Sequence, residues 1–358
     1  MRIRTLTVLA AITVPVTAAA IFLPDQVATV TAPVSGGKLL PGLKEKLGQV
    51  ATMTVTGPDG TVTLHRAPTT GKPEDGWTWA DKGGYPVPPA TIKPVLDAVA
   101  AMHGIEAKTQ RPKLYPRLDL GDPGKGSQAQ LVTLSDASGT ALARIVLGKH
   151  KTDPAPGAQE REYVRIPGTQ QTWLAAPAIT LPTDEMDWVD HAIIDIDANK
   201  IKQIAVSPVG GDGVTATRAK AADKLTVQNL PKGAKLKSVN AGSDLAGGVS
   251  GLELDDVKPA AKLAGSTAGT AHVETFDGLV ADLTLTKDGG QTWITVAATG
   301  TGAAAKQAAD ITARTKGWAY QVADTQSKIL LTKLGDITEA PPKPPTPPPA
   351  PFVAKKKK

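Results

Sequence analysis

Hydrophobic and polar positions alternate with a period of two along much of this chain, which is the pattern of half-buried β-strands. The stretch "VATMTVTGPDGTVTLHR", residues 50–66, places one alternating run on each side of a Gly/Asp turn. The stretch "IKQIAVSPVGGDGVTATR", residues 201–218, repeats that arrangement. Both stretches predict β-hairpins, because Gly and Asp supply the tight turn that joins two antiparallel strands.

Three other segments carry the period of an α-helix. The clearest has an apolar stripe at the spacing i, i+3, i+4, i+7, made by Ile92, Val95, Leu96, Val99 and Met102. This stripe predicts a helix with its N-cap at Thr91 and its end at Gly104. Further helices are expected over residues 303–316, ending before Gly317, and over residues 325–337.

The two halves of the chain echo each other at an offset near 150 residues. The matched pairs are 50–66 with 201–218, 95–109 with 244–260, 131–148 with 283–300, and 163–174 with 320–331. Four matches at one offset favour a duplicated unit over chance similarity. The copy at 244–260 is rich in glycine, so its helix is expected to be short or irregular.

Tight hairpins with few parallel crossovers predict an α+β protein. We expect two tandem related units of mainly antiparallel sheet with packed helices, after an N-terminal membrane helix. The expected segments are an anchor or signal at 1–24, a linker at 25–39, the first unit at 40–182, a connector at 183–199, the second unit at 200–338, and a disordered Pro-rich, Lys-ending tail at 339–358.

The N-terminus predicts export of the rest of the chain. Arg2 and Arg4 precede an uncharged run from Thr5 to Leu23, whose length as a helix is roughly 28 Å, about the thickness of a bilayer core. Arginines on the cytoplasmic side place the body of the chain outside. The alternative is a signal peptide that is cleaved after the A-x-A site of Ala18 and Ala20.

Charge excludes one class of partner. The chain carries a formal charge of +6, but seven positive charges lie at its two ends, which leaves the body between them at −1. A nearly neutral body lacks the basic footprint of a nucleic-acid-binding protein. The tail "PPKPPTPPPAPFVAKKKK" favours an extended polyproline II rod. Its lysines either contact an acidic surface such as anionic lipid, or are simply solvated.

Aromatic residues make up 4% of the chain, yet Trp77, Trp79 and Tyr85 fall within "GWTWADKGGYPV". The two tryptophans stand two apart on a predicted strand and therefore face the same side of a sheet. One interpretation places them in the core. The other makes Trp77, Trp79 and Tyr85 a ligand-binding surface on which a sugar or peptide stacks.

Motifs for metal or nucleotide chemistry are incomplete. "DIDANK" at 195–200 imitates a calcium loop but has Lys200 where the loop needs glycine and Val206 where it needs glutamate. Asp184, Glu185, Asp187, Asp190 and Asp195 surround His191, which is the composition of a metal site and equally that of a helix start.

The other motifs do not indicate a nucleotide-binding site either. "TGTGAAAKQAA" matches G-x-G-x-x-A through Gly300, Gly302 and Ala305, but its flanks predict antiparallel hairpins rather than a Rossmann unit. "GDPGKGS" lacks the Walker spacing. The chain has no cysteine, which excludes disulfides and thiolate chemistry. We therefore predict no catalytic residue, no metal and no cofactor.

Taken as a set, several stretches resemble the bacterial domain-of-unknown-function 4340 family. These stretches are "LPGLKEKLGQVATMTVTGPDGTVTLHR", "GWTWADKGGYPV", "LYPRLDLGDP", "MDWVDHAIIDIDANKIKQI" and "ETFDGLVADLTLTKDGGQTW". The likeness extends from about residue 40 to residue 337, and the proline-lysine tail is not part of it. The resemblance implies a single-pass envelope protein that is auxiliary to gliding-motility-type ABC transport systems.

We therefore expect a non-enzymatic accessory protein in the bacterial cytoplasmic membrane, with its body in the periplasm and an ABC-type permease or ATPase as its partner. The alternative expectation is a periplasmic binding module for cell-wall glycan or a small ligand, with Trp77, Trp79 and Tyr85 as its contact residues.

Overall fold

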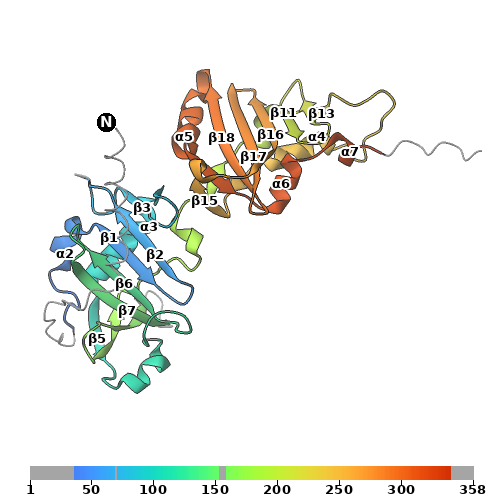
Figure 1. The fold of residues 1–358 in the computed structure, drawn as a ribbon. Helices are drawn as coiled ribbons and strands as arrows, with labels where there is room; N and C mark the ends of the chain where they lie inside the picture. The colour runs from blue at the N-terminus through green and yellow to red at the C-terminus, as the bar shows by residue number, and fades with distance from the viewer. Residues whose placement is uncertain (1–35, 69–70, 153–158, 340–358) are drawn as a thin grey trace, which may run out of the picture. The chain divides into compact units, whose positions relative to one another are not determined.

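The computed structural model describes residues 36–68, 71–152 and 159–339. The chain divides into two compact units, residues 1–191 and 192–358 (Figure 1), so the division falls inside the predicted connector. The predicted anchor at 1–24 and the tail from residue 340 lie outside the described residues. In the part of the chain that is described, no helix has both the length and the apolar character needed to cross a membrane.

The first unit is a nine-stranded antiparallel sheet with the order β4-β3-β2-β1-β6-β7-β8-β9-β5. Its strands are β1 (Thr52–Thr56), β2 (Thr61–Arg66), β3 (Trp77–Trp79), β4 (Tyr85–Pro86), β5 (His103–Ala107), β6 (Gln130–Ser135), β7 (Ala141–Lys151), β8 (Arg161–Arg165) and β9 (Thr172–Ala176). Its helices are α2 (Leu43–Lys46), α3 (Pro89–Ala101) and the 3₁₀ turns η1 (Leu47–Gln49), η2 (Pro112–Leu118) and η3 (Glu185–Trp188).

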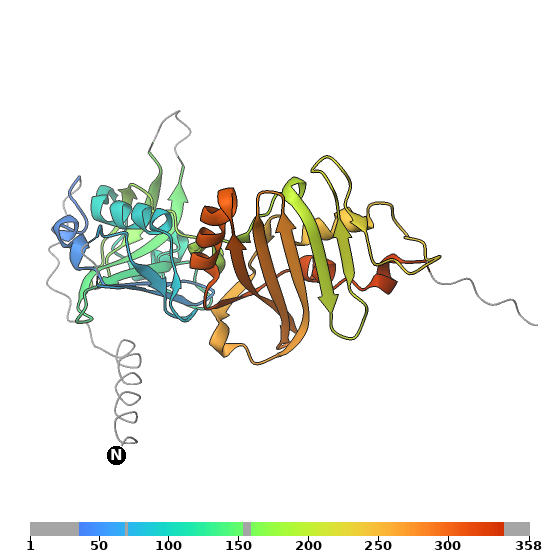
Figure 2. The ribbon, with the colours of Figure 1, turned by 90° about the horizontal axis from the view of Figure 1, so that it is seen from above.

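The second unit is an eight-stranded antiparallel sheet with the order β13-β12-β11-β16-β17-β18-β19-β15, and its long central strands lie side by side in Figures 1 and 2. Its strands are β11 (Ile201–Pro208), β12 (Val214–Thr217), β13 (Thr226–Val227), β15 (Asp256–Pro259), β16 (Ser266–Thr275), β17 (Leu279–Asp288), β18 (Gln291–Gly300) and β19 (Trp318–Gln321). A separate two-stranded sheet pairs β10 (Ala192–Ile194) with β14 (Leu252–Glu253).

The helices of the second unit are shorter than those predicted from the sequence. They are α4 (Ala241–Asp244), α5 (Ala305–Thr315), α6 (Asp324–Leu330) and α7 (Leu334–Ile337), with the 3₁₀ turns η4 (Ala198–Lys200), η5 (Leu245–Gly248), η6 (Ala260–Lys262) and η7 (Gly302–Ala304). The helix expected over 325–337 is two helices, because Lys333 is extended (φ −91°, ψ 151°). The short helix expected in the glycine-rich copy is confirmed by α4 and η5.

The two sheets share one strand order. The series β3-β2-β1-β6-β7-β8-β9-β5 in the first unit corresponds, position by position, to β13-β12-β11-β16-β17-β18-β19-β15 in the second. The predicted α+β class, with mainly antiparallel sheet, is confirmed. An identical order over eight strands is what a duplication of one folding unit produces.

Two of the four sequence matches were nevertheless wrong by one strand. Residues 131–148 form β6 and β7, which correspond to β16 and β17, and not to the β17 and β18 of residues 283–300. Residues 163–174 begin in β8, which corresponds to β18, and not to the β19 in which residues 320–331 begin. The connection between β5 and β6 in the first unit has 22 residues, 108–129. The corresponding connection between β15 and β16 in the second unit is much shorter, residues 260–265. The second unit has its longer connection further along the chain, between β18 and β19, where α5 is inserted. A fixed offset of about 150 residues therefore matches strands in the middle of the first unit with the wrong strands of the second unit, one position further along the sheet.

Helix α3 confirms the predicted apolar stripe. Its residues Ile92, Val95, Leu96 and Val99 are at most 1% exposed. The helix begins at Pro89 with Pro88 as its N-cap residue, earlier than the predicted cap at Thr91. Proline fits the first turn of a helix, because the N–H groups there have no hydrogen-bond partner within the helix and proline has no N–H. The stripe thus packs the helix into the core of the first unit.

Candidate functional site

Trp77, Trp79 and Tyr85 are buried in the first unit, with exposures of 1%, 0% and 8%. The indole Nε1 of Trp77 donates a hydrogen bond to the carbonyl of Pro73 at 2.8 Å. The ammonium of Lys82 lies 5.2 Å from the centre of the Trp79 ring. This burial leaves no ring face of the three side chains open to a ligand, so the structure supports the core interpretation over the stacking surface.

The second unit repeats these positions with aliphatic residues. The register pairs Thr78 with His65 in the first unit and Thr226 with Thr217 in the second. Leu225 and Val227 therefore occupy the places of Trp77 and Trp79, and they are also buried, at 3% and 7% exposure. A position that accepts leucine or valine in one copy and tryptophan in the other is a core position.

The acidic residues around His191 serve local structure. Asp184 and Asp187 form a capping box at η3, and the carboxylate of Asp195 accepts a hydrogen bond from the N–H of Gly251 at 2.9 Å. Asp197 caps η4, which leads directly into β11, so "DIDANK" forms a polar turn before a strand. Among the residues that the structure describes, no group of three or more His, Asp or Glu side chains is arranged to hold a metal ion.

A charged cluster lies across three strands of the second unit. The register pairs His272 of β16 with Asp282 of β17, and His272 Nδ1 lies 2.7 Å from Asp282 Oδ1. His272 Nε2 lies 3.3 Å from Glu274 Oε1, two residues along the same strand face. The other oxygen of Glu274 lies 3.8 Å from the ammonium of Lys202 on β11. Hydrogen bonding to Asp282, with a smaller contribution from Glu274, raises the pKa of His272 above its ordinary value.

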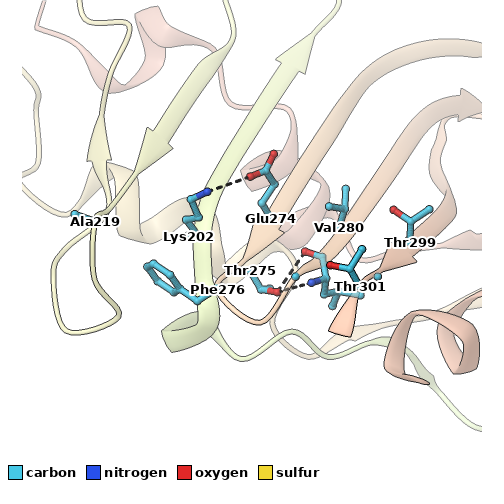
Figure 3. A pocket seen from close by; sticks show the side chains of 11 residues that line it. Lys202, Ala219, Glu274, Thr275, Phe276, Val280, Thr299 and Thr301 are labelled. Carbon is cyan, nitrogen blue, oxygen red and sulfur yellow. Dashed lines mark hydrogen bonds and ion pairs between the residues drawn. The ribbon is translucent and has the colours of Figure 1, made fainter. Parts of the chain in front are cut away.

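An open hollow of about 660 Å³ adjoins this cluster at the turn between β16 and β17 (Figure 3). Its lining includes Lys202 and Glu274, the threonines Thr299 and Thr301, and Phe276, whose ring lies on the side of Lys202 and points away from the two threonines. Phe276 is 41% exposed, a large value for so apolar a side chain. The hollow therefore combines one aromatic wall with hydroxyl, carboxylate and ammonium groups.

The backbone around Phe276 is held in place by polar contacts. Its N–H donates to the carbonyl of Lys200 at 2.9 Å. The hydroxyl of Thr275 donates to Asp277 at 2.5 Å and accepts the N–H of Leu279 at 3.0 Å, which closes the turn. The guanidinium of Arg218 lies 5.9 Å from the centre of the phenyl ring. The ring thus stands on a rigid support although it is exposed.

The equivalent turn of the first unit folds without an aromatic residue. It joins β6 to β7, and the carboxylate of Asp136 accepts hydrogen bonds from the N–H groups of Ser138 and Thr140, at 2.9 and 3.0 Å. Ala137, inside this turn, is exposed. Since a polar turn at the same place in the duplicated fold needs no phenyl group, the ring of Phe276 is not required for closing the hairpin.

Glu162 is the most perturbed acid in the first unit. It is 2% exposed on the core side of β8, where its Oε2 accepts the N–H of Ile179 at 3.1 Å. Its Oε1 lies 3.3 Å from Nε2 of His150. Burial raises the pKa of Glu162 to about 8, and the hydrogen bond from Ile179 opposes this only in part. A buried carboxyl that holds its proton near neutral pH is a source of pH-dependent stability.

The sequence alone does not single out His272. The contacts of His272 depend on the register of β16 with β17 and β11, which brings together residues up to 80 positions apart. The available signal for the hollow was "ETFDG", a turn sequence with phenylalanine where a polar residue is expected. A phenylalanine inside a Gly/Asp turn is the feature that would have located this surface.

The fold and the hollow define a two-unit antiparallel α+β protein with an open hollow on its second unit. The model of the family described as "Domain of unknown function (DUF4340)" matches residues 77–269, more than half of the chain, and the chain belongs to this family. The match runs from β3 to β16 across both units, and it is shorter than the span of 40–337 expected from sequence. Among curated proteins, none matches this chain.

Proposed function

We propose that the chain is a non-enzymatic accessory protein on the outer face of the bacterial cytoplasmic membrane, held there by residues 1–24. In this proposal its second unit docks on a membrane protein complex, an ABC-type transporter in which a permease or ATPase subunit is the partner. The observation that carries the proposal is the exposed Phe276 on its rigid turn, at 41% exposure. The family resemblance supplies the class of partner, and the basic, apolar N-terminus supports the location.

The surroundings of Phe276 have the composition of a protein interface. Interfaces typically place an aromatic side chain at the centre and polar or charged groups at the rim. Here the rim holds two ion pairs, Lys200 with Asp277 at 3.3 Å and Lys202 with Glu274 at 3.8 Å. We name the surface formed by Lys202, Glu274, Phe276, Thr299 and Thr301 the Phe276 surface.

A comparison of full-length wild-type protein with Phe276→Ser tests this proposal. Each is purified gently from membranes of the source bacterium, and the proteins that accompany it are quantified by mass spectrometry. We expect transporter subunits with the wild type and a loss of at least tenfold with Phe276→Ser. Ala137→Ser, in the equivalent turn of the first unit, is the matched control. Equal recovery from all three proteins, or no membrane partner with any of them, would contradict the proposal.

A second function has one observation in its favour. The hollow is large enough for a small ligand, and the hydroxyls of Thr299 and Thr301 with the carboxylate of Glu274 are groups that bind a polyhydroxylated molecule. In this alternative the protein is a periplasmic binding module for cell-wall glycan. Titration of the chain with soluble peptidoglycan fragments, followed by NMR of the threonine methyl groups, distinguishes the two. Saturable shifts at Thr299 and Thr301 would favour the glycan.

A further inference from the structure

The contacts of His272 require two protons on one ring. Its Nδ1 faces Asp282 at 2.7 Å and its Nε2 faces Glu274 at 3.3 Å, so each nitrogen has a carboxylate oxygen as its partner. Carboxylates only accept hydrogen bonds, and a neutral imidazole carries a single N–H. The imidazolium form therefore satisfies both carboxylates, whereas the neutral ring leaves one of them facing a lone pair.

The charge of the cluster changes with that proton. Lys202 and a protonated His272 balance Glu274 and Asp282, so the four groups sum to zero, and loss of the ring proton leaves −1. The residues that face His272 and Asp282 from the next strands outward are Ala205 on β11 and Ala297 on β18, which carry no charge. The nearby Lys200 and Asp277 form a balanced pair. The proton on His272 thus sets the net charge of this region.

We propose that docking at the Phe276 surface is proton-linked, through a partner segment that places a Lys or Arg side chain against Glu274 and Asp282 when His272 is neutral. This inference rests on the proposed function and adds the chemistry of the partner. Glu274 lines the same hollow as Phe276, and Asp282 lies across the His272 ring from Glu274, so one extended segment is long enough to contact the phenyl ring and both carboxylates. The side chain of Asp282 is 62% exposed, and the small Ala205 and Ala297 leave it open to an incoming cation.

The direction of the linkage follows from competition between two cations. When the pH is below the raised pKa of His272, the imidazolium is hydrogen-bonded to the carboxylates of Asp282 and Glu274, and the cluster that a partner cation approaches has no net charge. Above that pKa the partner cation meets a cluster of −1. Affinity is therefore expected to increase with pH, by roughly fivefold or more between about pH 6 and about pH 8.5. By reciprocity, the bound partner lowers the pKa of His272.

Photo-cross-linking tests this inference with a photo-reactive phenylalanine analogue at position 276 of the full-length chain in intact cells. We expect one membrane protein to be cross-linked several-fold more strongly at about pH 8.5 than at about pH 6. Its linked peptide is expected to contain Lys or Arg. Replacement His272→Ala fixes the cluster at −1, so cross-linking should become strong at both pH values. Replacement Asp282→Asn should weaken cross-linking at about pH 8.5.

His65→Ala is the matched control, since His65 also lies on a sheet face and bonds a cross-strand neighbour, Thr52, at 3.2 Å. It should retain the pH dependence of the wild type. The same partner captured equally at both pH values, or through a peptide without a basic residue, would overturn the inference and leave the docking function standing. Absence of any partner at either pH would instead count against the docking function itself. In parallel, NMR titration should place the pKa of His272 lower in Asp282→Asn than in the wild type.

Discussion

Arg66 and Arg218 occupy the same place in the two sheets and make the same kind of contact. Arg66 is the last residue of β2 and Arg218 directly follows β12, and each donates to backbone carbonyls on both sides of its hairpin. Arg66 donates to Gly48 at 3.1 Å and to Lys72 at 2.7 Å. Arg218 donates to Ala198 before its hairpin and to Ala221 after it, the latter at 3.1 Å. The duplication therefore extends from strand order to individual hydrogen bonds.

The loop that each arginine holds is also duplicated. In residues 72–75 the N–H of Lys72 donates to the Asp75 carboxylate at 2.9 Å, and in residues 220–223 the N–H of Lys220 donates to the Asp223 carboxylate at 3.1 Å. The guanidinium reaches the carbonyl of each aspartate, at 3.1 Å for Asp75 and 3.3 Å for Asp223. The arginine thus fixes the loop that leads into the third strand of each unit.

Replacement of either arginine should destabilise its own unit. Hydrogen bonds from a charged donor contribute about 1.5–3 kcal/mol each, and exposure reduces this, so Arg66→Met or Arg218→Met should lower the free energy of unfolding by about 2 kcal/mol. Lysine at either position should recover only part of the loss, because it lacks the planar fork. Urea unfolding measures both effects. Full stability in the methionine variants would show that these carbonyls are equally well satisfied by water.

The buried indoles give a second prediction. Trp79→Ala should cost about 3–5 kcal/mol of unfolding free energy, because a fully buried aromatic ring leaves a cavity. Thr78→Ala, one residue away on the opposite strand face, should cost less than about 1.5 kcal/mol. Urea unfolding of the two variants checks this contrast. A fully stable Trp79→Ala variant would contradict the assignment of Trp79 to the core.

Glu162 gives a prediction on pH. Its pKa is about 8 in the folded chain against an ordinary value of 4.5, so between these values the folded state keeps a proton that the unfolded state releases. Stability should therefore fall as pH rises from about 4.5 to about 8. Glu162→Gln should remove this fall and be more stable than the wild type near pH 8, by roughly 2–5 kcal/mol.

Denaturant unfolding across this pH range measures the effect. His150→Ala is the useful comparison, because the ring of His150 lies 3.3 Å from the carboxyl while burial is the main cause of the shift. The fall in stability should persist in His150→Ala. Parallel pH profiles for the wild type and Glu162→Gln would mean that the buried carboxyl is ionised in the folded protein.

Much of the fold could be predicted from the sequence, because local patterns encode it. The alternation around the turns at 57–60 and 209–213 identified the two leading hairpins, and the stripe from Ile92 to Val99 identified α3. The pairing of later strands could not be predicted in the same way. Neighbouring hairpins have nearly the same hydrophobic alternation. The lengths of the loops between them decide which strand of the first unit corresponds to which strand of the second.

The site was harder to predict than the fold, because it depends on register. His272 and Asp282 are ten residues apart in the chain and meet only because β16 and β17 pair at that register. Trp77 and Trp79 stand out by composition, although their burial is a property of the folded sheet and not of the local sequence. Phe276 carries a local signal, an aromatic residue in a turn, but its exposure and the hollow beside it are visible only in the folded chain.

Phe276 should matter little to stability. Its ring is 41% exposed and lies outside the core, so Phe276→Ser should change the free energy of unfolding by no more than about 0.5–1 kcal/mol. Thermal unfolding compared with the wild type tests this. A loss of several kcal/mol would show that the ring serves folding, which would remove the main reason to assign it to a partner.

The most direct test of the central claim compares two photo-reactive positions in the full-length chain. One is Phe276, and the other is Ala137 in the equivalent turn of the first unit, which has the same place in the fold without the aromatic ring. Cross-linking in intact cells followed by mass spectrometry identifies what each position contacts. We expect subunits of a membrane transport complex from position 276 and none from position 137. Equal capture from both positions, or no membrane protein from position 276, would contradict the central claim.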